Sequence, residues 1–266
     1  AKGTGGPAGG AGPPPNEPER PVGPVNWARD GKDSLISKDQ GGDENCNVYA
    51  GDRAATGPAG QQVPVGRNLT AAKGVRAVIY SVPKTDPDIM YVGLNDRDKA
   101  WHDLYRVRIS TGERTLMRQN TGKIAQWVFD NSGTLRLALH TDDNGDTKIF
   151  RVDPTDFTLV YTCNVFETCG PDRFNKDNSK VYMVTNKGTP DLTRLVLFDP
   201  STKTEQLVES DPLNRVDFGN ATFSDETNEL VATSYVDDST MMYWKNDAWE
   251  SAYNELKKKL QGKQIT

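Results

Sequence analysis

Two short sequence phrases recur along the chain at nearly constant spacing, and this periodicity is the strongest constraint on its fold. The first phrase is an aromatic residue followed by a polar turn and an apolar strand pattern. It begins at Phe129, Phe174 and Phe223, at intervals of 45 and 49 residues. Earlier copies begin at Trp27 and, with a degenerate turn, at Tyr80. A repeat of this length that contains several short strands is typical of a four-stranded β-propeller blade.

The second phrase is a strand pattern that lies later in each repeat. Its central apolar residue is Tyr105, then Phe150 after 45 residues and Val196 after a further 46, and an earlier copy has Tyr49, 56 residues before Tyr105. Two independent phrases therefore keep step along the chain. The sequence predicts an all-β propeller of about five four-stranded blades, with a ring that is either complete or incomplete.

The clearest copy of the pattern occupies residues 91–116. It predicts a strand at 91–94, a polar link at 95–103, a second strand at 104–109 and a third strand from Arg114. Residues 110–113 form a turn in which Gly112 supplies the positive φ that other residues adopt at a cost. This arrangement is an antiparallel meander.

Composition divides the chain into three parts. Residues 1–24 are rich in Gly, Pro and Ala and are expected to be flexible or extended. Residues 25–245 hold the propeller blades, with a turn at 39–45 and a longer surface loop at 51–66. Residues 246–262 predict an amphipathic helix that begins near Asn246 and ends near Gly262, because apolar side chains recur at spacings of four, three and four residues. These side chains are Trp249, Tyr253, Leu256 and Leu260.

The net charge of −5 argues against nucleic acid or an anionic membrane as the main partner. No apolar run approaches the roughly 18 residues needed to span a bilayer, so no membrane span is predicted. We expect any targeting segment to have been removed or to lie outside these residues. The compartment therefore stays open.

Catalytic and metal-binding patterns are not found in the sequence. There is no Gly-x-Ser-x-Gly nucleophile elbow, and the two histidines, His102 and His140, do not form part of a predicted triad. The cysteines and histidines lack the paired spacing of a zinc site, and the acidic segment 142–146 reads as an Asn-Gly turn rather than a calcium loop. We therefore predict no catalytic residue, no metal and no cofactor.

Two groups of side chains remain as candidate sites. Cys163 and Cys169, with five residues between them, are either a disulfide in an oxidising compartment or two half-buried free thiols, and Cys46 has no obvious partner. The densest polar group lies in the predicted link and is either an inter-blade network or a binding site that faces a tunnel or a partner. Its candidate binding residues are Asn95, Arg97, Asp98, His102 and Asp103.

Long phrases at residues 41–49, 91–116, 169–188, 191–212 and 216–260 resemble the N-terminal β-propeller of prolyl-oligopeptidase-type serine peptidases, the S9 group that includes acylaminoacyl-peptidase and dipeptidyl-peptidase relatives. The repeats are also similar to TolB-like propeller repeats. The resemblance covers about residues 25–262. It implies a propeller that caps a separate α/β-hydrolase domain, and this hydrolase domain carries the catalytic Ser, Asp and His. The central tunnel of the propeller restricts access to short peptides.

The resemblance leads to two functional expectations. In the first, the chain is a non-catalytic, substrate-gating propeller that works with a hydrolase domain and meets short peptides. In the second, it is a peptidase-derived propeller that serves as a binding or scaffold subunit among other protein subunits. The relatives have seven or eight blades and this sequence predicts about five, so we expect further blades or a partner to cover the terminal sheets.

Overall fold

The structure, a computed structural model, describes residues 25–39, 45–52, 54–55, 66–188 and 191–260. In chain order its elements are β1 (Val25–Trp27), β2 (Asp33–Lys38), β3 (Asn47–Asp52), β4 (Arg67–Asn68), β5 (Ala77–Ser81), β6 (Ile89–Asp98), β7 (Trp101–Arg108), β8 (Arg114–Arg118), β9 (Ile124–Phe129), β10 (Leu135–Thr141), β11 (Thr147–Val152), β12 (Phe157–Cys163), β13 (Cys169–Phe174), β14 (Val181–Thr185), β15 (Arg194–Asp199), β16 (Thr204–Glu209), β17 (Asn220–Phe223), β18 (Leu230–Val236), β19 (Thr240–Trp244) and α1 (Asp247–Lys259).

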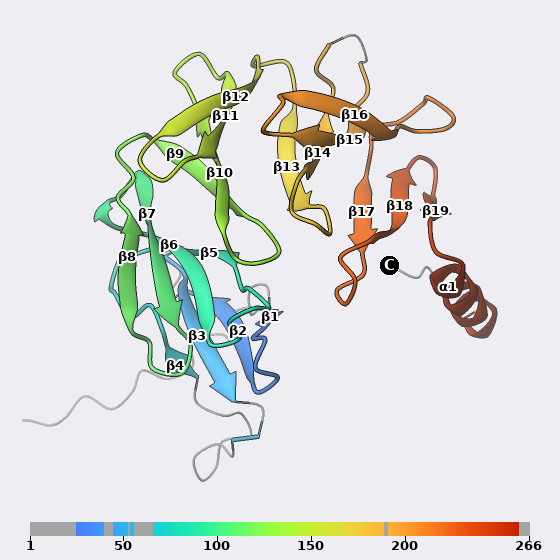
Figure 1. Ribbon diagram of the computed structural model, residues 1–266. Helices are drawn as coiled ribbons and strands as arrows, with labels where there is room; N and C mark the ends of the chain where they lie inside the picture. The colour runs from blue at the N-terminus through green and yellow to red at the C-terminus, as the bar shows by residue number, and fades with distance from the viewer. Residues whose placement is uncertain (1–24, 40–44, 53, 56–65, 189–190, 261–266) are drawn as a thin grey trace, which may run out of the picture.

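The strands form five antiparallel sheets, and each sheet is built from consecutive strands. Blades 1 to 4 are β1–β4, β5–β8, β9–β12 and β13–β16, and blade 5 is β17–β19. Figure 1 shows the blades following one another in chain order around a central region. The predicted all-β propeller of about five blades and its C-terminal helix are confirmed. Blade 5 has three strands among the described residues where four were predicted, and α1 lies beside β19.

The hydrophobic core is divided among the interfaces between neighbouring blades. Leu35 of blade 1 and Met90 of blade 2 belong to one buried cluster, and Leu137 of blade 3 and Phe174 of blade 4 belong to another. Two smaller clusters join blades 2 and 3 and blades 4 and 5. Each blade therefore depends on its neighbours to bury its apolar faces.

In blades 3, 4 and 5 the recurring aromatic residue has a clear structural role, because it packs on the second strand of the preceding blade. The ring of Phe129 stacks on Tyr91 with centroids 4.4 Å apart, and the ring of Phe223 lies 5.0 Å from that of Tyr182. Phe174 instead lies under a guanidinium group, with the Cζ of Arg136 5.0 Å from its ring centroid. This contact explains why the first sequence phrase keeps the period of the blades.

The predicted polar link at residues 95–103 is wrong. Strand β6 continues as far as Asp98 and strand β7 begins at Trp101, so most of the predicted link is a two-stranded extension of blade 2. The pairing shifts register between Leu94 and Asp98. Polar side chains bond to the local backbone there, which allows charged residues to occupy strand positions that pattern analysis assigned to a loop.

Helix α1 begins where the sequence predicts. The side-chain oxygen of Asn246 accepts hydrogen bonds from the backbone N–H groups of Ala248 (3.1 Å) and Trp249 (3.2 Å), which caps the first turn. The ring of Tyr253 packs against Trp244 of β19 at 5.1 Å. None of the residues of α1 is buried. No helix in the described part of the chain has the length and apolar character needed to cross a membrane.

Several sequence predictions fall outside the described residues. They concern the segment 1–24, most of the turn at 39–45, most of the loop at 51–66, and the helix end at Gly262.

The crossover from blade 3 to blade 4 holds the two closely spaced cysteines. Cys163 ends β12, Cys169 begins β13, and the structure joins them as a disulfide with Cα atoms 6.1 Å apart. Both residues are buried, whereas Cys46 is a half-buried free thiol. The bond ties the outermost strand of one blade to the first strand of the next.

We expect a Cys163→Ser/Cys169→Ser variant to lose about 2 kcal/mol of unfolding free energy, because the unfolded chain is no longer restrained by the short closed loop. Chemical denaturation under non-reducing conditions measures this loss, and a Cys46→Ser variant is the control. Peptide mapping without reductant should recover a 163–169 cross-link and an alkylated Cys46. Recovery of two alkylated thiols at positions 163 and 169 would contradict the disulfide.

Candidate functional site

The sequence-predicted polar cluster lies on the extended hairpin of blade 2, and its centre is an ion pair. Arg97 donates from Nε and Nη2 to the two carboxylate oxygens of Asp103 at 2.7 and 2.8 Å. The same carboxylate accepts the backbone N–H of Asn120 at 2.6 Å, and Asp103 is only 2% exposed. The hydrogen bonds from Arg97 lower the pKa of Asp103 below its ordinary value.

The other predicted residues of this cluster are bonded to nearby backbone. Asn95 accepts from the N–H of Arg76 at 2.6 Å and donates to the carbonyl of Lys99 at 3.1 Å. The Asp98 carboxylate accepts from the N–H of Ala100 in the hairpin turn at 2.9 Å. These bonds use the polar atoms within blade 2, which favours the structural interpretation of the cluster over the binding interpretation.

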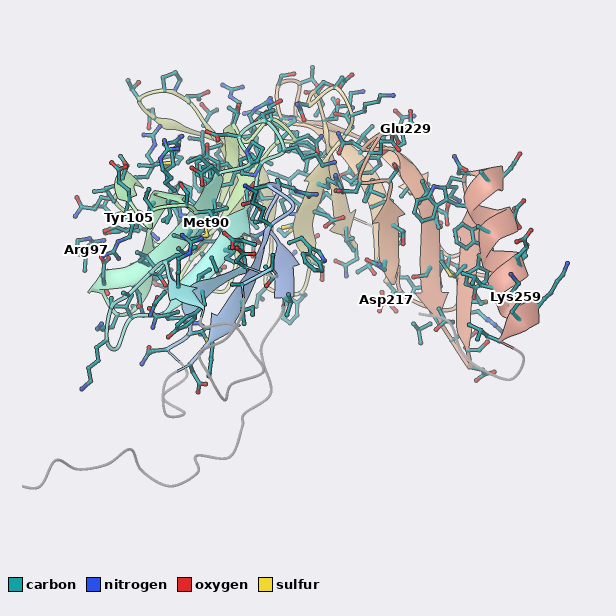
Figure 2. The ribbon with its side chains drawn as sticks, turned by 90° about the horizontal axis from the view of Figure 1, so that it is seen from below. Met90, Arg97, Tyr105, Asp217, Glu229 and Lys259 are labelled. Carbon is teal, nitrogen blue, oxygen red and sulfur yellow. A yellow bond between two sulfur atoms is a disulfide. The ribbon has the colours of Figure 1, made fainter. Side chains whose placement is uncertain are left out.

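His102 is the fifth predicted residue, and it is half-buried on β7 beside Gly93 of β6. A Cβ atom added at Gly93 would lie 2.9 Å from the Cβ of His102, so the two residues are in close contact. Burial and the nearby charge of Arg76 lower the pKa of His102, and its buried Nε2 has no hydrogen-bond partner in the described structure. The neutral ring is therefore favoured. Figure 2 places Arg97 at the periphery of the molecule, on the opposite side from Lys259 of α1.

Neither histidine belongs to a catalytic arrangement in the described residues. The Nδ1 of His140 lies 3.0 Å from the carbonyl oxygen of Gly122 and 3.1 Å from that of Lys123. Neither histidine ring is hydrogen-bonded to a serine or a carboxylate within the described ranges. The described part of the chain also contains no group of three His, Cys, Asp or Glu residues placed to hold a metal ion.

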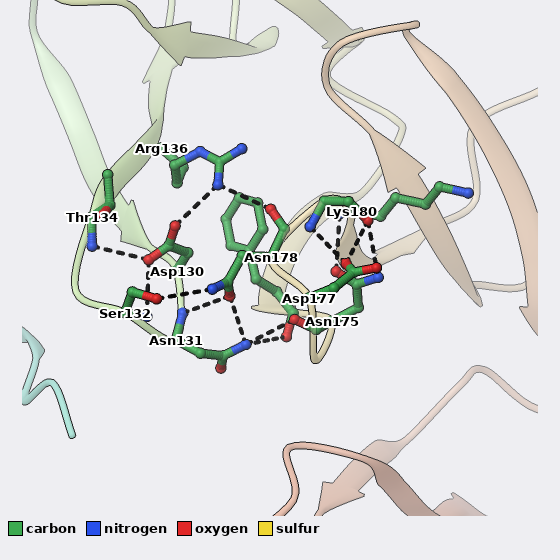
Figure 3. A network of polar contacts seen from close by, with 11 residues as sticks. Asp130, Asn131, Ser132, Thr134, Arg136, Asn175, Asp177, Asn178 and Lys180 are labelled. Atoms are coloured by element: carbon green, nitrogen blue, oxygen red, sulfur yellow. Dashed lines mark hydrogen bonds and ion pairs between the residues drawn. The ribbon is translucent and has the colours of Figure 1, made fainter. Parts of the chain in front are cut away.

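A second polar region, which the sequence interpretation missed, forms where the first turns of the blades meet. The turn that follows the recurring aromatic residue joins the first and second strands of each blade. Figure 3 shows this junction for blades 3 and 4, where the side-chain amide of Asn131 donates to the carbonyl of Asn175 at 2.8 Å and to the Oδ1 of Asn178 at 2.8 Å. The turns of neighbouring blades are therefore hydrogen-bonded to each other.

The same junction contains a buried carboxylate. Asp130 is 8% exposed and accepts the backbone N–H groups of Ser132 and Thr134, each at 3.0 Å. Its second oxygen accepts a hydrogen bond from Nη1 of Arg136 at 3.0 Å. This nitrogen also donates to the carbonyl of Asn178 at 2.9 Å (Figure 3). Asp130 thus shapes its own turn and orients the arginine that reaches the next blade.

The turns of distant blades also meet, around one carboxylate of blade 5. Arg29 of blade 1 holds Asp225 through two hydrogen bonds of 2.6 and 3.2 Å. Lys84 of blade 2 lies 3.2 Å from the Asp225 carboxylate and donates to Asn228 at 3.2 Å. Arg173 of blade 4 donates to the same Asn228 oxygen at 2.7 Å. We call these five residues the axial cluster.

The cations of the axial cluster stabilise the charged form of its carboxylate. Hydrogen bonds from Arg29 and Lys84 lower the pKa of Asp225. The sequence carries a signal for this cluster, since Arg29 and Asp225 each stand two residues after the recurring aromatic. In a propeller the corresponding turns of all blades lie at the same end of the ring, so the turns that carry Arg29 and Asp225 are expected to lie near each other.

Two neighbouring cavities open at the axial cluster. A cavity of 220 Å³ is lined by Arg29, Lys84, Arg173, Asn131 and other residues of the first turns. A cavity of 410 Å³ shares Arg29 with it and is lined on its other side by Trp27 and Tyr80. The exposed fraction of Trp27 is 62%, so an aromatic surface lies beside a basic one.

Comparison with known proteins finds similarity to two dipeptidyl peptidases. No protein-family model matches the sequence. The chain is 29% identical over 211 residues, or 78% of its length, to dipeptidyl aminopeptidase BIII of Pseudoxanthomonas mexicana, and 27% identical over 202 residues, or 70% of its length, to dipeptidyl peptidase family member 6 of Caenorhabditis elegans. These matches span 29% and 27% of the two relatives, so the chain corresponds to less than a third of either protein.

Solved structures support the same fold. A TolB structure from Acinetobacter baumannii aligns with 84% of this chain and 52% of its own at 13% identity and a TM-score of 0.51. A prolyl endopeptidase aligns with 83% of this chain and 40% of its own at 11% identity and a TM-score of 0.50. At these identities the likeness concerns the fold alone. Together with the dipeptidyl peptidase relatives, it confirms that this chain resembles the propeller of prolyl-oligopeptidase-type serine peptidases.

Proposed function

We propose that this chain is the non-catalytic, substrate-gating propeller of a dipeptidyl-peptidase-like serine peptidase. The observation that carries the proposal is the similarity to dipeptidyl aminopeptidase BIII over 78% of the chain, in residues that fold as propeller blades. The sequence has no Gly-x-Ser-x-Gly elbow, so a hydrolase domain would supply the nucleophile, the base and the orienting carboxylate.

The proposed gating acts through size and flexibility. The first turns of blades 1, 2 and 5 and strand β13 of blade 4 approach one another around Asp225 and Asn228, so folded proteins are too wide to pass at that end, whereas an extended peptide of a few residues is narrower. Exposed ion pairs contribute little to stability individually. Turns held by such contacts can separate at a small cost in free energy, which suits an entrance that admits flexible substrates.

Sequencing the coding region around these residues tests the proposal. We expect an in-frame Gly-x-Ser-x-Gly motif about 150 to 250 residues beyond Thr266, within segments that predict alternating strands and helices. The absence of that motif, together with purification of the chain bound to other proteins, would favour a scaffold role.

The scaffold role is the second candidate, and the surface of α1 favours it. Trp249, Leu256 and Leu260 of the helix are 47%, 49% and 45% exposed. Neighbouring exposed apolar side chains are a feature of protein interaction surfaces. Cross-linking of the protein in its native extract, followed by mass spectrometry, distinguishes the two roles: links from Lys257–Lys259 to a hydrolase domain support the peptidase, and links to unrelated subunits support the scaffold.

This 266-residue chain should be catalytically inactive by itself. We expect no release of dipeptides from dipeptidyl-p-nitroanilide substrates above the buffer rate, and no labelling by a fluorophosphonate probe, because the sequence has no nucleophile elbow and neither histidine is hydrogen-bonded to a serine within the described residues. A serine peptidase assayed in parallel verifies the reagents. Stoichiometric labelling of the chain would overturn its non-catalytic assignment.

A further inference from the structure

The cations that line the cavity of 220 Å³ at the axial cluster outnumber the carboxylates that could neutralise them. Arg29 and Lys84 share a single carboxylate, Asp225, and Arg173 is hydrogen-bonded to a neutral amide, that of Asn228. A basic surplus therefore faces the cavity of 220 Å³, although the protein as a whole carries a net charge of −5.

Two further acids near this cavity do not remove the surplus. Asp130 also lines it, but its charge is matched by Arg136, which donates to it at 3.0 Å. Asp172 precedes Arg173 on β13, where its side chain is exposed, and it attracts Arg173 through charge alone. The three cations thus face two carboxylates, those of Asp225 and Asp172.

The geometry of the cluster already suits a carboxylate. Two guanidinium nitrogens of Arg29 contact two oxygens of Asp225, which is the paired arrangement that arginine forms with carboxylates. The side chains of Arg29, Lys84 and Asp225 are 35%, 31% and 64% exposed, so solvent reaches the site. A carboxylate from outside can approach the same cations and compete with Asp225.

We propose that Arg29, Lys84 and Arg173 bind the carboxylate of a short peptide at the meeting point of the blade turns. The adjoining cavity of 410 Å³, with Trp27 and Tyr80, receives the apolar side chain next to that carboxylate. Asp225 holds the cations together when the site is empty and competes with the ligand when it is filled. The substrate class of the proposed peptidase is therefore short peptides with a free carboxylate, an assignment that rests on the proposed function.

Binding of a matched pair of peptides to the 266-residue chain tests this site. The probes are acetyl-Gly-Phe with a free carboxylate and the same peptide with a C-terminal amide. Their affinity for the chain is measured by calorimetry and by the change in tryptophan fluorescence. We expect the amide to bind at least about ten-fold more weakly, because it cannot form the charge-assisted hydrogen bonds. Equal affinity of the acid and the amide would overturn the proposal.

Variants of the axial cluster should act in opposite directions. Lys84→Gln and Arg173→Gln should each weaken binding of the acid by about ten-fold, whereas Asp225→Asn should strengthen it because the internal competitor is removed. Arg151→Gln, at a similarly exposed arginine paired with Asp153 elsewhere on blade 3, should leave the affinity unchanged. General damage to the fold would weaken binding in all four variants, which circular dichroism and melting temperature would reveal. Weakened binding by folded Asp225→Asn would contradict the assigned competition.

Inorganic phosphate separates a peptide carboxylate site from a general oxyanion site. We expect phosphate to compete with acetyl-Gly-Phe only at concentrations well above those of the peptide, because phosphate has no group for the aromatic cavity. Phosphate that competes as strongly as the peptide would overturn the carboxylate assignment. These measurements use the chain itself, so their failure would leave the test for a hydrolase domain in the coding region unaffected.

Discussion

An Asp103→Asn variant is expected to lose about 3 kcal/mol of unfolding free energy at pH 7, the cost of breaking a buried, hydrogen-bonded charge pair. The parent carboxylate accepts two hydrogen bonds from Arg97 and one from the N–H of Asn120. An amide at this position keeps the shape, but it presents an N–H₂ group to the donors of Arg97 and carries no charge. Urea denaturation followed by circular dichroism measures the loss.

The loss caused by Asp103→Asn should depend on pH. The pKa of Asp103 is lower in the folded than in the unfolded protein, because Arg97 stabilises the ionised form. The unfolded state therefore binds more protons in acid, so the contribution of Asp103 is fully present above about pH 4 and falls as the pH drops through the folded pKa. The parent and the variant should converge at low pH. A constant difference between them would show that the charge of Asp103 is not the cause.

The control for this prediction is Asp98→Asn in the same hairpin. Asp98 accepts one hydrogen bond, from the N–H of Ala100, and an asparagine side chain can accept the same bond. We expect a much smaller change than for Asp103→Asn. If both variants retained the parent stability and Asp103→Asn instead lost peptide binding, the hairpin cluster would be a binding site and not a structural network.

An Asp130→Ala variant is expected to be destabilised by about 3 kcal/mol, with the damage spreading from blade 3 to blade 4. The substitution leaves the N–H groups of Ser132 and Thr134 without their acceptor and frees Arg136 from its position between Asp130 and Asn178. Hydrogen exchange should therefore accelerate in the blade 4 turn as well as in the blade 3 turn.

Asp177→Ala is the matched control, because Asp177 occupies the corresponding turn of blade 4. Its carboxylate accepts hydrogen bonds from the N–H and the hydroxyl of Ser179, both within its own exposed turn. We expect little change in stability and faster exchange in that turn alone. If the Asp130→Ala variant also showed faster hydrogen exchange in its own turn alone, the junction between blades 3 and 4 would not depend on Asp130.

The order and number of the blades could be predicted from the sequence because one physical contact repeats. The recurring aromatics of blades 3, 4 and 5 each reach the preceding blade, so their spacing equals the length of a blade. The third strand of blade 2 and its Gly112 turn follow from local rules, and Gly112 has a φ of +75°. Local patterns of this kind are readable because strand alternation and turn chemistry involve neighbouring residues.

Other features depend on contacts that no local pattern encodes. Strands β6 and β7 carry Asn95, Asp98 and Asp103 because their side chains bond to particular backbone groups, which single-residue preferences for strand or loop do not register. The axial cluster joins residues 29 and 225, and only the curvature of the stacked blades decides that they meet. The candidate site at the blade turns was therefore missed, although each of its residues lies in a repeat that the sequence reveals.

The pairing of Arg29 with Asp225 has a consequence for biosynthesis. A blade is built from consecutive strands, so its hydrogen bonds can form soon after its last strand leaves the ribosome, and its apolar faces are buried once the next blade follows. Arg29, in contrast, emerges early and must wait for about 196 further residues before its carboxylate exists. Until then its guanidinium group is without this partner, so the contact between blade 1 and blade 5 can form only late in synthesis.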